Sequence, residues 1–340
     1  MFTAANVTTL ADIAKIPVPV IWGAIEEKYN ASTNPFRAAG VVKSDALFQS
    51  RAAGEGSRTT VQSWNALPYV PANISNDDPT MHSTPLKLTT RTYDAIRTHR
   101  NISFSEMDLV VDLMGQDPLG NIAERVGAQY MPQDETARMF AILDGIVAAD
   151  KANGSQITIT DTVNVFNIQM LIAGLQKLGD AKASIKALGV SSATQALMAS
   201  QNIAGYVNGN AGPLASADLG FGSFGGLPLI VDDRFEDKVV STKTVARLYG
   251  LGTDLFHVGR APATNPVEFE RDASAGNGGG QSTVYFRWQD ILHPVGYSFS
   301  GTVASNGGAT EAELRTANKW TRVSDKKNIP LVVIEAPLSA

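Results

Sequence analysis

The chain has 340 residues, of which 44% are hydrophobic, with a formal net charge of −5 at pH 7 and no cysteine. That length suits about two domains, and the acidic balance excludes a globally basic nucleic-acid-binding surface. The absence of cysteine excludes disulfides, thiolate metal sites and cysteine nucleophiles, and no apolar run approaches the ~18 residues of a membrane span, so no membrane partner is expected.

The first 57 residues are predicted to form an extended arm and not a domain. A helical turn is expected over residues 6–15 and a short helix over 18–30, after Pro19. The remainder is punctuated by Pro35 and by several glycines. Such a stretch needs another surface to order it.

A projecting β-hairpin is predicted next. Residues 59–65 and 86–92 have the composition and alternation of strands, whereas the 20 residues between them contain four prolines. Connections longer than about 12–15 residues are unusual inside a compact domain and are often functional.

Two helices are expected to follow the hairpin. Ser103 and Glu106 have the spacing of a capping box for a helix that ends at Gly115. Asp117 and Pro118 then begin a long helix that reaches about residue 150. Because Pro132 removes a backbone donor inside this helix, a bend or break is predicted between about residues 127 and 133, eased by Gly127.

The middle of the chain alternates strands and helices, and the last third is rich in strands. A strand at 156–163, a helix at 164–180 and a strand at 184–190 are followed by a helix capped by Ser191 or Ser192. Later strands are expected at 227–233, 244–250, 253–259, 266–272, 282–292, 296–301 and 329–336. The chain shows no repeat at a fixed period.

Catalytic and cofactor motifs are weak. Residues 220–225 spell GxGxxG but precede a strand, which favours a flexible loop over a dinucleotide site. None of the four histidines has metal-site spacing. Asp232 and Asp233 end a strand, but adjacent strand residues point to opposite faces, so a turn is favoured over a metal or catalytic site. A triad of residues distant in sequence stays open, and no cofactor is indicated.

The order of these parts resembles the major capsid proteins of tailed bacteriophages, which have the HK97-like fold, and within them the gp13-like coat protein family. No single motif carries the resemblance. It rests on a collinear set of stretches that covers most of residues 40–335: 38–47, 61–69, 86–110, 115–130, 175–198, 224–234, 267–276, 289–299 and 316–336.

The resemblance implies an α+β fold with four parts. These are an N-terminal arm at 1–57, an extended β-hairpin or E-loop at 58–100, a P-domain at 101–158 and 262–340 with a spine helix at 118–150, and a central α/β A-domain at 159–261. The glycine–strand–Asp232–Asp233 piece would then be A-domain scaffold.

The implied function is structural and not enzymatic. Copies would form hexamers and pentamers of an icosahedral virion capsid that encloses phage double-stranded DNA and is assembled in the cytoplasm of the bacterial host. Expected partners are a separate scaffolding protein, a portal protein, non-specifically bound DNA and a decoration protein. The alternatives are an encapsulin-like compartment around a protein cargo and, in a different class, a two-domain hydrolase that uses Asp232 or Asp233.

Two sets of surface residues are candidates for these contacts. The basic arm residues Lys28, Arg37 and Lys43 are expected to meet DNA phosphates or, equally, acids of a neighbouring subunit. The second set lies on the E-loop, which is expected to cover an acidic P-domain surface of the next subunit. The E-loop residues are Trp64, Tyr69, Lys87, Arg91 and Arg97, and the acids are Glu106, Asp108 and Asp112.

Overall fold

A computed structural model describes most of the chain. The described residues are 18–31, 34–54, 56–65, 67, 69–114, 122–200, 223–224, 227–235, 238–240 and 243–339. The helical turn expected at 6–15 lies outside these ranges, as do the expected helix boundary at 115–118 and the glycines of the GxGxxG spelling.

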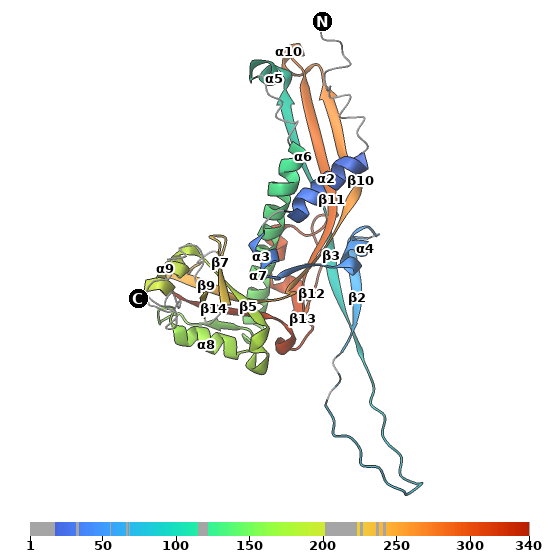
Figure 1. The fold of residues 1–340 in the computed structure, drawn as a ribbon, viewed down its shortest axis with the longest axis vertical. Coiled ribbons are helices and arrows are strands. Elements are labelled where there is room, and N and C mark those ends of the chain that lie inside the picture. Colours follow the sequence, from blue (N-terminus) through green and yellow to red (C-terminus); the bar gives the residue numbers. More distant parts are fainter. Residues whose placement is uncertain are drawn as a thin grey trace, which may run out of the picture.

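A long sheet forms the axis of an elongated molecule (Figure 1). Its strands run in the order β1-β10-β11-β3-β2. The chain reverses between β10 and β11 in a short turn, α10, where Gly276 and Asn277 have φ values of 63° and 58°, and a left-handed backbone of this kind favours glycine and asparagine. The strands and the turn are β1 (Val42–Ser44), β2 (Arg58–Trp64), β3 (Thr90–Met107), β10 (Phe256–Asp272), α10 (Ala275–Gly278) and β11 (Gln281–Pro294).

The expected hairpin projects from one end of this sheet (Figure 1). Strand β2 pairs antiparallel with the first residues of β3, and the pairing runs from Arg58 opposite Ile96 to Trp64 opposite Thr90. The returning strand therefore begins at Thr90 and not at residue 86. Residues 86–89 contain no helix or strand, because the pairing partner of β3 ends at Trp64.

The N-terminal segment lies along the same sheet as four short elements. Helix α2 begins at Val18, close to the helix start expected around Pro19, and helix α4 has Asp45 as its N-cap, whose side chain accepts a hydrogen bond from the backbone NH of Leu47. The segment contains α2 (Val18–Ala31), α3 (Pro35–Ala38), β1 and α4 (Ala46–Ala52).

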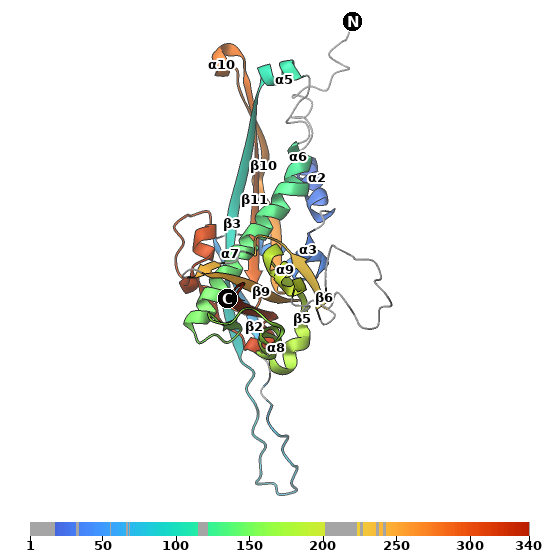
Figure 2. The same ribbon diagram turned by 90° about the vertical axis from the view of Figure 1, so that its left-hand side faces the viewer.

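The spine helix is continuous but not α-helical throughout. A π-helical turn, η3 (Val126–Tyr130), lies between α6 (Ile122–Arg125) and α7 (Met131–Ala152), and Pro132 falls in the first turn of α7, where its missing donor is tolerated. The predicted interruption is therefore a π-turn within one rod (Figure 2). A Cβ added at Gly127 would lie 2.4 Å from the carbonyl oxygen of Ile25, so glycine is needed where α2 crosses the spine.

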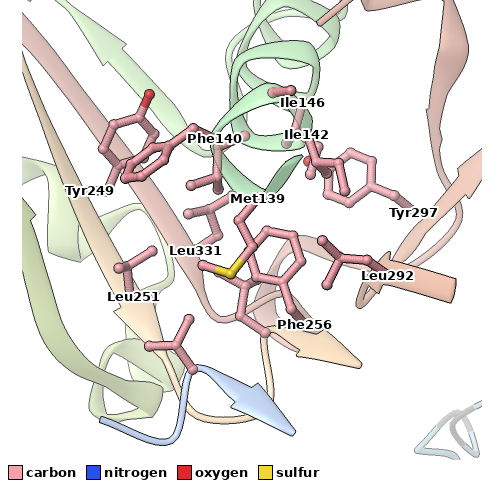
Figure 3. Packing of buried hydrophobic residues seen from close by; sticks show 14 of the residues in the cluster. Met139, Phe140, Ile142, Ile146, Tyr249, Leu251, Phe256, Leu292, Tyr297 and Leu331 are labelled. Carbon is pink, nitrogen blue, oxygen red and sulfur yellow. The ribbon is translucent and has the colours of Figure 1, made fainter. Parts of the chain in front are cut away.

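Helix α7 is buried from several sides and forms the centre of the main core. Figure 3 shows Met139, Phe140, Ile142 and Ile146 between side chains from both sheets and from β12. The contacts from the other elements are Tyr249 and Leu251 of β9, Phe256 of β10, Leu292 of β11, Tyr297 of β12 and Leu331 of β14. The spine thus joins the long sheet to the compact domain beside it.

That compact domain is built on a second, mixed sheet with the strand order β4-β14-β9-β5-β7-β6, and β8 is added to β9. Ser191 caps its helix α9, because the Ser191 hydroxyl accepts a hydrogen bond from the backbone NH of Thr194 at 3.1 Å. The elements are β4 (Thr158–Thr160), α8 (Ile168–Gln176), η4 (Gly179–Ser184), β5 (Ile185–Val190), α9 (Ser192–Ser200), β6 (Ser223–Phe224), β7 (Leu227–Val231), β8 (Lys238–Val240), β9 (Lys243–Gly252) and β14 (Leu331–Pro337).

Smaller elements close the base of the long sheet. Strands β12 (Tyr297–Phe299) and β13 (Trp320–Arg322) form a two-stranded sheet. A full capping box between Thr310 and Glu313 begins helix α11 (Glu311–Leu314). Two 3₁₀ turns complete the region, η5 (Ala317–Lys319) and η6 (Lys326–Asn328). Within the described ranges, no helix combines the length and the apolarity that crossing a membrane requires.

The structure corrects two expectations. Residues 103–107 are strand and not helix, because Ser103 and Glu106 pair with Tyr285 and Ser282 of β11, and only α5 (Asp108–Met114) is helical there. The domain boundaries also move. Strand β14, assigned above to the P-domain, lies between β4 and β9 of the second sheet, and residues 256–261, assigned to the A-domain, belong to β10 of the long sheet.

Candidate assembly surfaces

The projecting hairpin presents apolar side chains to solvent. Between β2 and β3 its described residues form no helix or strand, and all but Asn65 are exposed. Trp64 is 66% exposed, Tyr69 92% and Ile74 96%. Further exposed apolar residues on the same hairpin are Leu67, Val70, Met81, Leu86 and Leu88. Surface apolar residues gathered in this way mark an interaction site.

The basic residues expected on the E-loop do not share one environment. Lys87 is exposed, and Arg91 is half-buried with its Nε donating to the Ser63 hydroxyl at 2.8 Å. Arg97 is buried, and it donates to the carbonyl oxygens of Ala52 and Gly54. The expectation that Arg97 contacts a neighbouring subunit is wrong, because its guanidinium instead holds the end of α4 against β3.

The acids expected to receive the E-loop lie at the opposite end of the long sheet. Asp108 forms a two-pronged ion pair with Arg271, with oxygen-to-nitrogen distances of 3.0 and 2.5 Å, and this hydrogen bonding holds the pKa of Asp108 below its ordinary value. Asp112 is exposed and Glu106 is half-buried. Asp108 is therefore already matched within its own chain, which leaves Asp112 as the exposed acid of the set.

The same tip carries apolar residues that the sequence did not identify. Leu109, Val110 and Leu113 of α5 are exposed, and Phe269 of β10 lies partly exposed on the same part of the sheet. The sequence predicted a capped helix from Ser103 to Gly115 here. Once residues 103–107 form a strand, only two turns of helix remain, and their apolar side chains have no core to pack on.

The three candidate basic residues of the N-terminal segment are each paired with an acid of the same chain. Lys28 contacts Glu124 at 2.8 Å and Lys43 contacts Asp254 at 3.0 Å, and all four side chains are about half-exposed. Arg37 is mostly buried and bonds to Glu135, which lies on the spine helix. Arg37 therefore keeps only a small exposed surface, and its expected contact with DNA or with a neighbouring subunit stays a prediction.

Asp232 and Asp233 serve the turn that follows β7. Asp232 accepts hydrogen bonds from the backbone NH and the guanidinium of Arg234. Asp233 accepts a hydrogen bond from the backbone NH of Ser192 at 3.0 Å, and hydrogen bonding to the side chain and then to the backbone of Ser192 lowers the pKa of its carboxyl. The two carboxylates thus bind different partners. In the parts of the chain that the structure describes, no group of three or more acids or histidines is placed to hold a metal ion.

Two histidines, His257 and His293, have structural roles. His257 lies with its Nδ1 at 2.7 Å from a carboxylate oxygen of Asp45, the N-cap of α4. His293 is buried, stacks on Tyr93 and has its Nε2 at 2.8 Å from the carbonyl oxygen of Tyr297. Burial lowers the pKa of His293 to about 4, so the ring is neutral at pH 7 and Nε2 is the donor to the carbonyl.

Buried ion pairs tie the spine helix to both sheets. Arg138 of α7 binds Asp290 of β11 through two hydrogen bonds of 2.7 and 2.5 Å. On the other side, Arg247 of β9 binds Asp144 of α7 at 2.5 Å and Glu335 of β14 at 2.7 Å. Such pairs orient the surfaces described above by fixing the two sheets relative to one helix.

Comparison with known proteins gives one sequence relative over nearly the whole chain. The major capsid protein of Bacillus phage SPP1 is 26% identical over 334 residues, which cover 96% of this chain and 98% of that protein. No protein-family model matches the chain.

Solved structures match it at much lower identity. The capsid of Ralstonia phage GP4 superimposes with a TM-score of 0.56 at 10% identity and covers 89% of this chain and 88% of that one. The cyanophage Pam1 capsid gives 0.52 at 10% identity, with 85% and 87% covered. Microbacterium phage Oxtober96 gives 0.51 at 12% identity, with 90% and 91% covered. At these identities the likeness is one of fold.

Proposed function

The chain is a shell-forming coat protein of the phage type with the HK97-like α+β fold, and we propose that its copies assemble as hexamers and pentamers into an icosahedral capsid around double-stranded DNA. The resemblance recognised in the sequence is thereby confirmed, and the place of the protein is the capsid of a virion. A contact between different surfaces of identical copies closes into a bounded shell when its rotation is that of a point group.

The observation that carries the assembly proposal is the exposure of the E-loop. A connection of this length without a helix or strand cannot bury its own apolar side chains, and an isolated two-stranded ribbon is marginally stable in water. A neighbouring copy is the partner proposed to cover it, with Trp64 and Tyr69 as the central anchors, because aromatic residues dominate such contacts.

Charge supplies a secondary contribution in this proposal. Lys87 and Arg91 remain available on the E-loop and are proposed to approach the neighbour's Asp112 and Glu106. Exposed ion pairs contribute only about 0.2–1 kcal/mol each, so they select the register of the contact, and the apolar side chains provide most of its free energy.

We further propose that the protein has no catalytic activity. Asp232 and Asp233 are used by the turn and by the start of α9, so the hydrolase alternative has lost the carboxylate pair on which it rested. A separate scaffolding protein, a portal protein, a decoration protein and non-specific contact with packaged DNA complete the proposed set of partners, with assembly in the host cytoplasm. Purified shells that hold a protein cargo and no DNA would instead favour the encapsulin-like alternative.

The decisive experiment removes the E-loop without touching the core. Residues 66–88 are replaced by a two-residue turn that joins β2 to β3, and the product is examined by size exclusion and negative-stain electron microscopy. We expect a folded, soluble subunit that forms no closed shells, because the replaced residues lie outside the buried clusters.

A single substitution gives a finer version of the same test. Trp64→Ala is expected to reduce the yield of closed shells strongly, and Arg91→Glu more weakly, because the first removes an apolar anchor and the second reverses a half-buried charge. The matched control is Val163→Ser, which removes a side chain of similar exposure (72%) from the A-domain. Normal shells from the E-loop variants would show that copies contact one another elsewhere.

A further inference from the structure

One edge of the long sheet is open over the half that leads to the tip. Strand β3 has β11 on one side and β2 on the other, but the pairing with β2 ends at Ile96. From Asn101 to Met107, β3 pairs with β11 alone. Among the described strands, none covers the other side of β3 over this stretch.

A hydrogen bond near the middle of β3 shows which of its backbone groups face the open edge. The NH of His99 donates to the carbonyl oxygen of Gly307 at 2.7 Å and therefore points away from β11. Backbone groups alternate in direction along an antiparallel strand, and the pairing with β11 has no bulge here. The NH and C=O groups of Asn101, Ser103 and Ser105 thus point outward, and in the described part of the chain they have no backbone partner.

This edge lacks the features by which proteins usually block an exposed strand. Between Asn101 and Ser105 there is no proline and no charged residue, and the register is unbroken. All three residues with outward backbone groups are exposed. An unblocked edge is a template for pairing with another chain, and the addition of an extended segment to such an edge is a common mode of recognition.

The E-loop contains an extended segment that lacks a pairing partner. Residues 86–88, Leu-Lys-Leu, alternate as a strand does, and the sequence predicts a strand there. In the subunit they form none, and all three are exposed, because β2 ends at Trp64. A partner from outside the subunit would complete this strand.

The segment and the open edge cannot meet within one subunit. The E-loop leaves the sheet at Thr90, and Asn101 lies eleven residues further along the same strand, roughly 36 Å away at the rise of an extended strand. Figure 1 shows the hairpin and α5 at opposite ends of the sheet. A contact between them therefore joins two copies through unlike surfaces, the kind of contact that closes into rings.

The apolar side chains of the two places are compatible. Leu86 and Leu88 point to the same face of an extended strand. On the receiving edge, Ile102 and Phe104 share one face and pack, partly buried, against the P-domain core. An added strand would set the two leucines beside these residues and extend that apolar face.

Charge favours the same arrangement. Residues 83–93 contain Lys87 and Arg91 and no acid, whereas residues 101–114 contain three acids and no base. Of these acids, Asp112 is exposed. The donated segment is therefore basic and the receiving end of the sheet acidic, which favours the approach of one to the other.

We propose that residues 86–88 of one copy add as a strand to the edge of β3 at Asn101–Ser105 of the next copy. The inference rests on the proposed assembly into shells, and it names the surface that receives the E-loop. The added strand supplies the hydrogen bonds that the outward backbone groups lack in the subunit, and it continues the sheet from one copy into the next.

Hydrogen exchange of backbone amides tests the new ladder by comparing purified shells with the unassembled subunit. In shells the amides of Asn101, Ser103 and Ser105 should exchange at least about tenfold more slowly, the effect of one hydrogen bond of ordinary net strength. The amide of Phe104, which faces β11 in the subunit, is the internal control and should change little. Equal exchange of the three amides in shells and subunits would overturn the proposal.

Disulfide trapping identifies the partner strand. The chain has no cysteine, and adjacent strands lie about 4.8 Å apart, within the reach of a disulfide. Lys87→Cys combined with Ser103→Cys or with Ser105→Cys should give covalent oligomers in oxidised shells. The control, Lys87→Cys with the exposed A-domain position Val163→Cys, should give none. Shells without cross-links in both test pairs would overturn this contact and leave the proposed assembly standing.

A proline at the edge tests the same hydrogen bonds through assembly. Ser103→Pro removes an NH that has no backbone partner in the subunit, and proline is tolerated at strand edges, so the subunit should fold and the yield of shells should fall strongly. Ser103→Ala keeps the NH and is the matched control, with a normal yield. Normal shells from Ser103→Pro would overturn the proposal. If this variant does not fold, the exchange and trapping results decide, and a wild-type chain that forms no shells would overturn both this contact and the proposed assembly.

Discussion

Asp290→Asn tests whether the buried ion pair on the spine helix holds the P-domain together. Asp290 has no exposed surface. Its carboxylate accepts two hydrogen bonds from Arg138, one from the hydroxyl of Thr98 at 2.6 Å and one from the indole NH of Trp288 at 3.3 Å. These partners come from the spine helix, β3 and β11, so one carboxylate joins three elements.

The expected cost follows from what the substitution leaves behind. Removing one partner of a buried ion pair costs about 3–5 kcal/mol, because the other charge stays buried. The amide retains the shape and one acceptor, and Arg138 keeps an ion pair with Asp134 at 3.1 Å. We therefore expect the free energy of unfolding to fall by about 3 kcal/mol, the lower end of that range. This is a large fraction of a typical stability of about 5–15 kcal/mol.

Acid should reproduce part of this effect in the wild-type chain. Burial opposes ionisation of Asp290, but the charge and hydrogen bonds of Arg138 outweigh it and hold the pKa of Asp290 below its ordinary value. A depressed pKa contributes stability above the unfolded-state value of about 3.9, and that contribution is lost as pH falls through the folded-state pKa. In Asp290→Asn this contribution to stability should already be missing at neutral pH, because the amide does not ionise.

The assay is urea unfolding of the unassembled subunit, followed by tryptophan fluorescence. Glu268→Gln is the control, because it breaks an exposed pair with Arg287 and should cost less than about 1 kcal/mol. Adding Arg138→Met to Asp290→Asn should recover part of the loss, since no unmatched charge then remains. A loss below that of the control, or a double variant less stable than the single one, would refute the reasoning.

Three further outcomes are expected. In wild type, His293 stays neutral in the folded state down to about pH 4, whereas the unfolded state binds a proton near pH 6.5, so the free energy of unfolding should fall by about 3 kcal/mol between these pH values. His293→Gln should remove this pH dependence. An unchanged slope in the variant would exclude His293 as its cause. Gly127→Ala should destabilise the subunit by about 1–3 kcal/mol, measured by the same urea titration, because the added Cβ meets the backbone of Ile25. Arg247→Met should cost about 1.5–3 kcal/mol, less than Asp290→Asn, because both its acidic partners keep another base, and a larger loss in thermal or urea unfolding would contradict this.

Local patterns in the sequence were sufficient where local chemistry decides the structure. Period-2 alternation and the four prolines located the hairpin and its long connection, and the Ser191 cap and the strand before Asp232 were found for the same reason. The sequence predicted an interruption at the place of the π-turn but not the π-turn itself. The missing backbone NH of Pro132 shows that a hydrogen bond is lost, but it does not show which backbone geometry compensates for the loss.

Long-range pairing decided the cases in which the sequence misled. The spacing of Ser103 and Glu106 has the form of a capping box, but the pairing of β3 with β11 extends the chain there. Strand β14 belongs to the second sheet because it pairs with β4 and β9, which lie 80 residues or more away in sequence. Charge was misjudged in the same way, because Arg37 and Arg97 look like surface residues until Glu135 and two carbonyl oxygens are placed beside them.

Strand β3 explains why these buried contacts matter for assembly. Its 18 residues run from the base of the E-loop to the tip at α5, a span of roughly 56 Å at the rise of an extended strand. It is paired with β11 over its second half and with β2 over its first, and Thr98 near its middle is held by the Asp290 cluster. The two exposed apolar surfaces are therefore fixed at opposite ends of one rigid element. If copies form both hexamers and pentamers, as proposed, the differences in curvature between them are expected to be absorbed beyond Thr90 and beyond Met107, at the two ends of this strand.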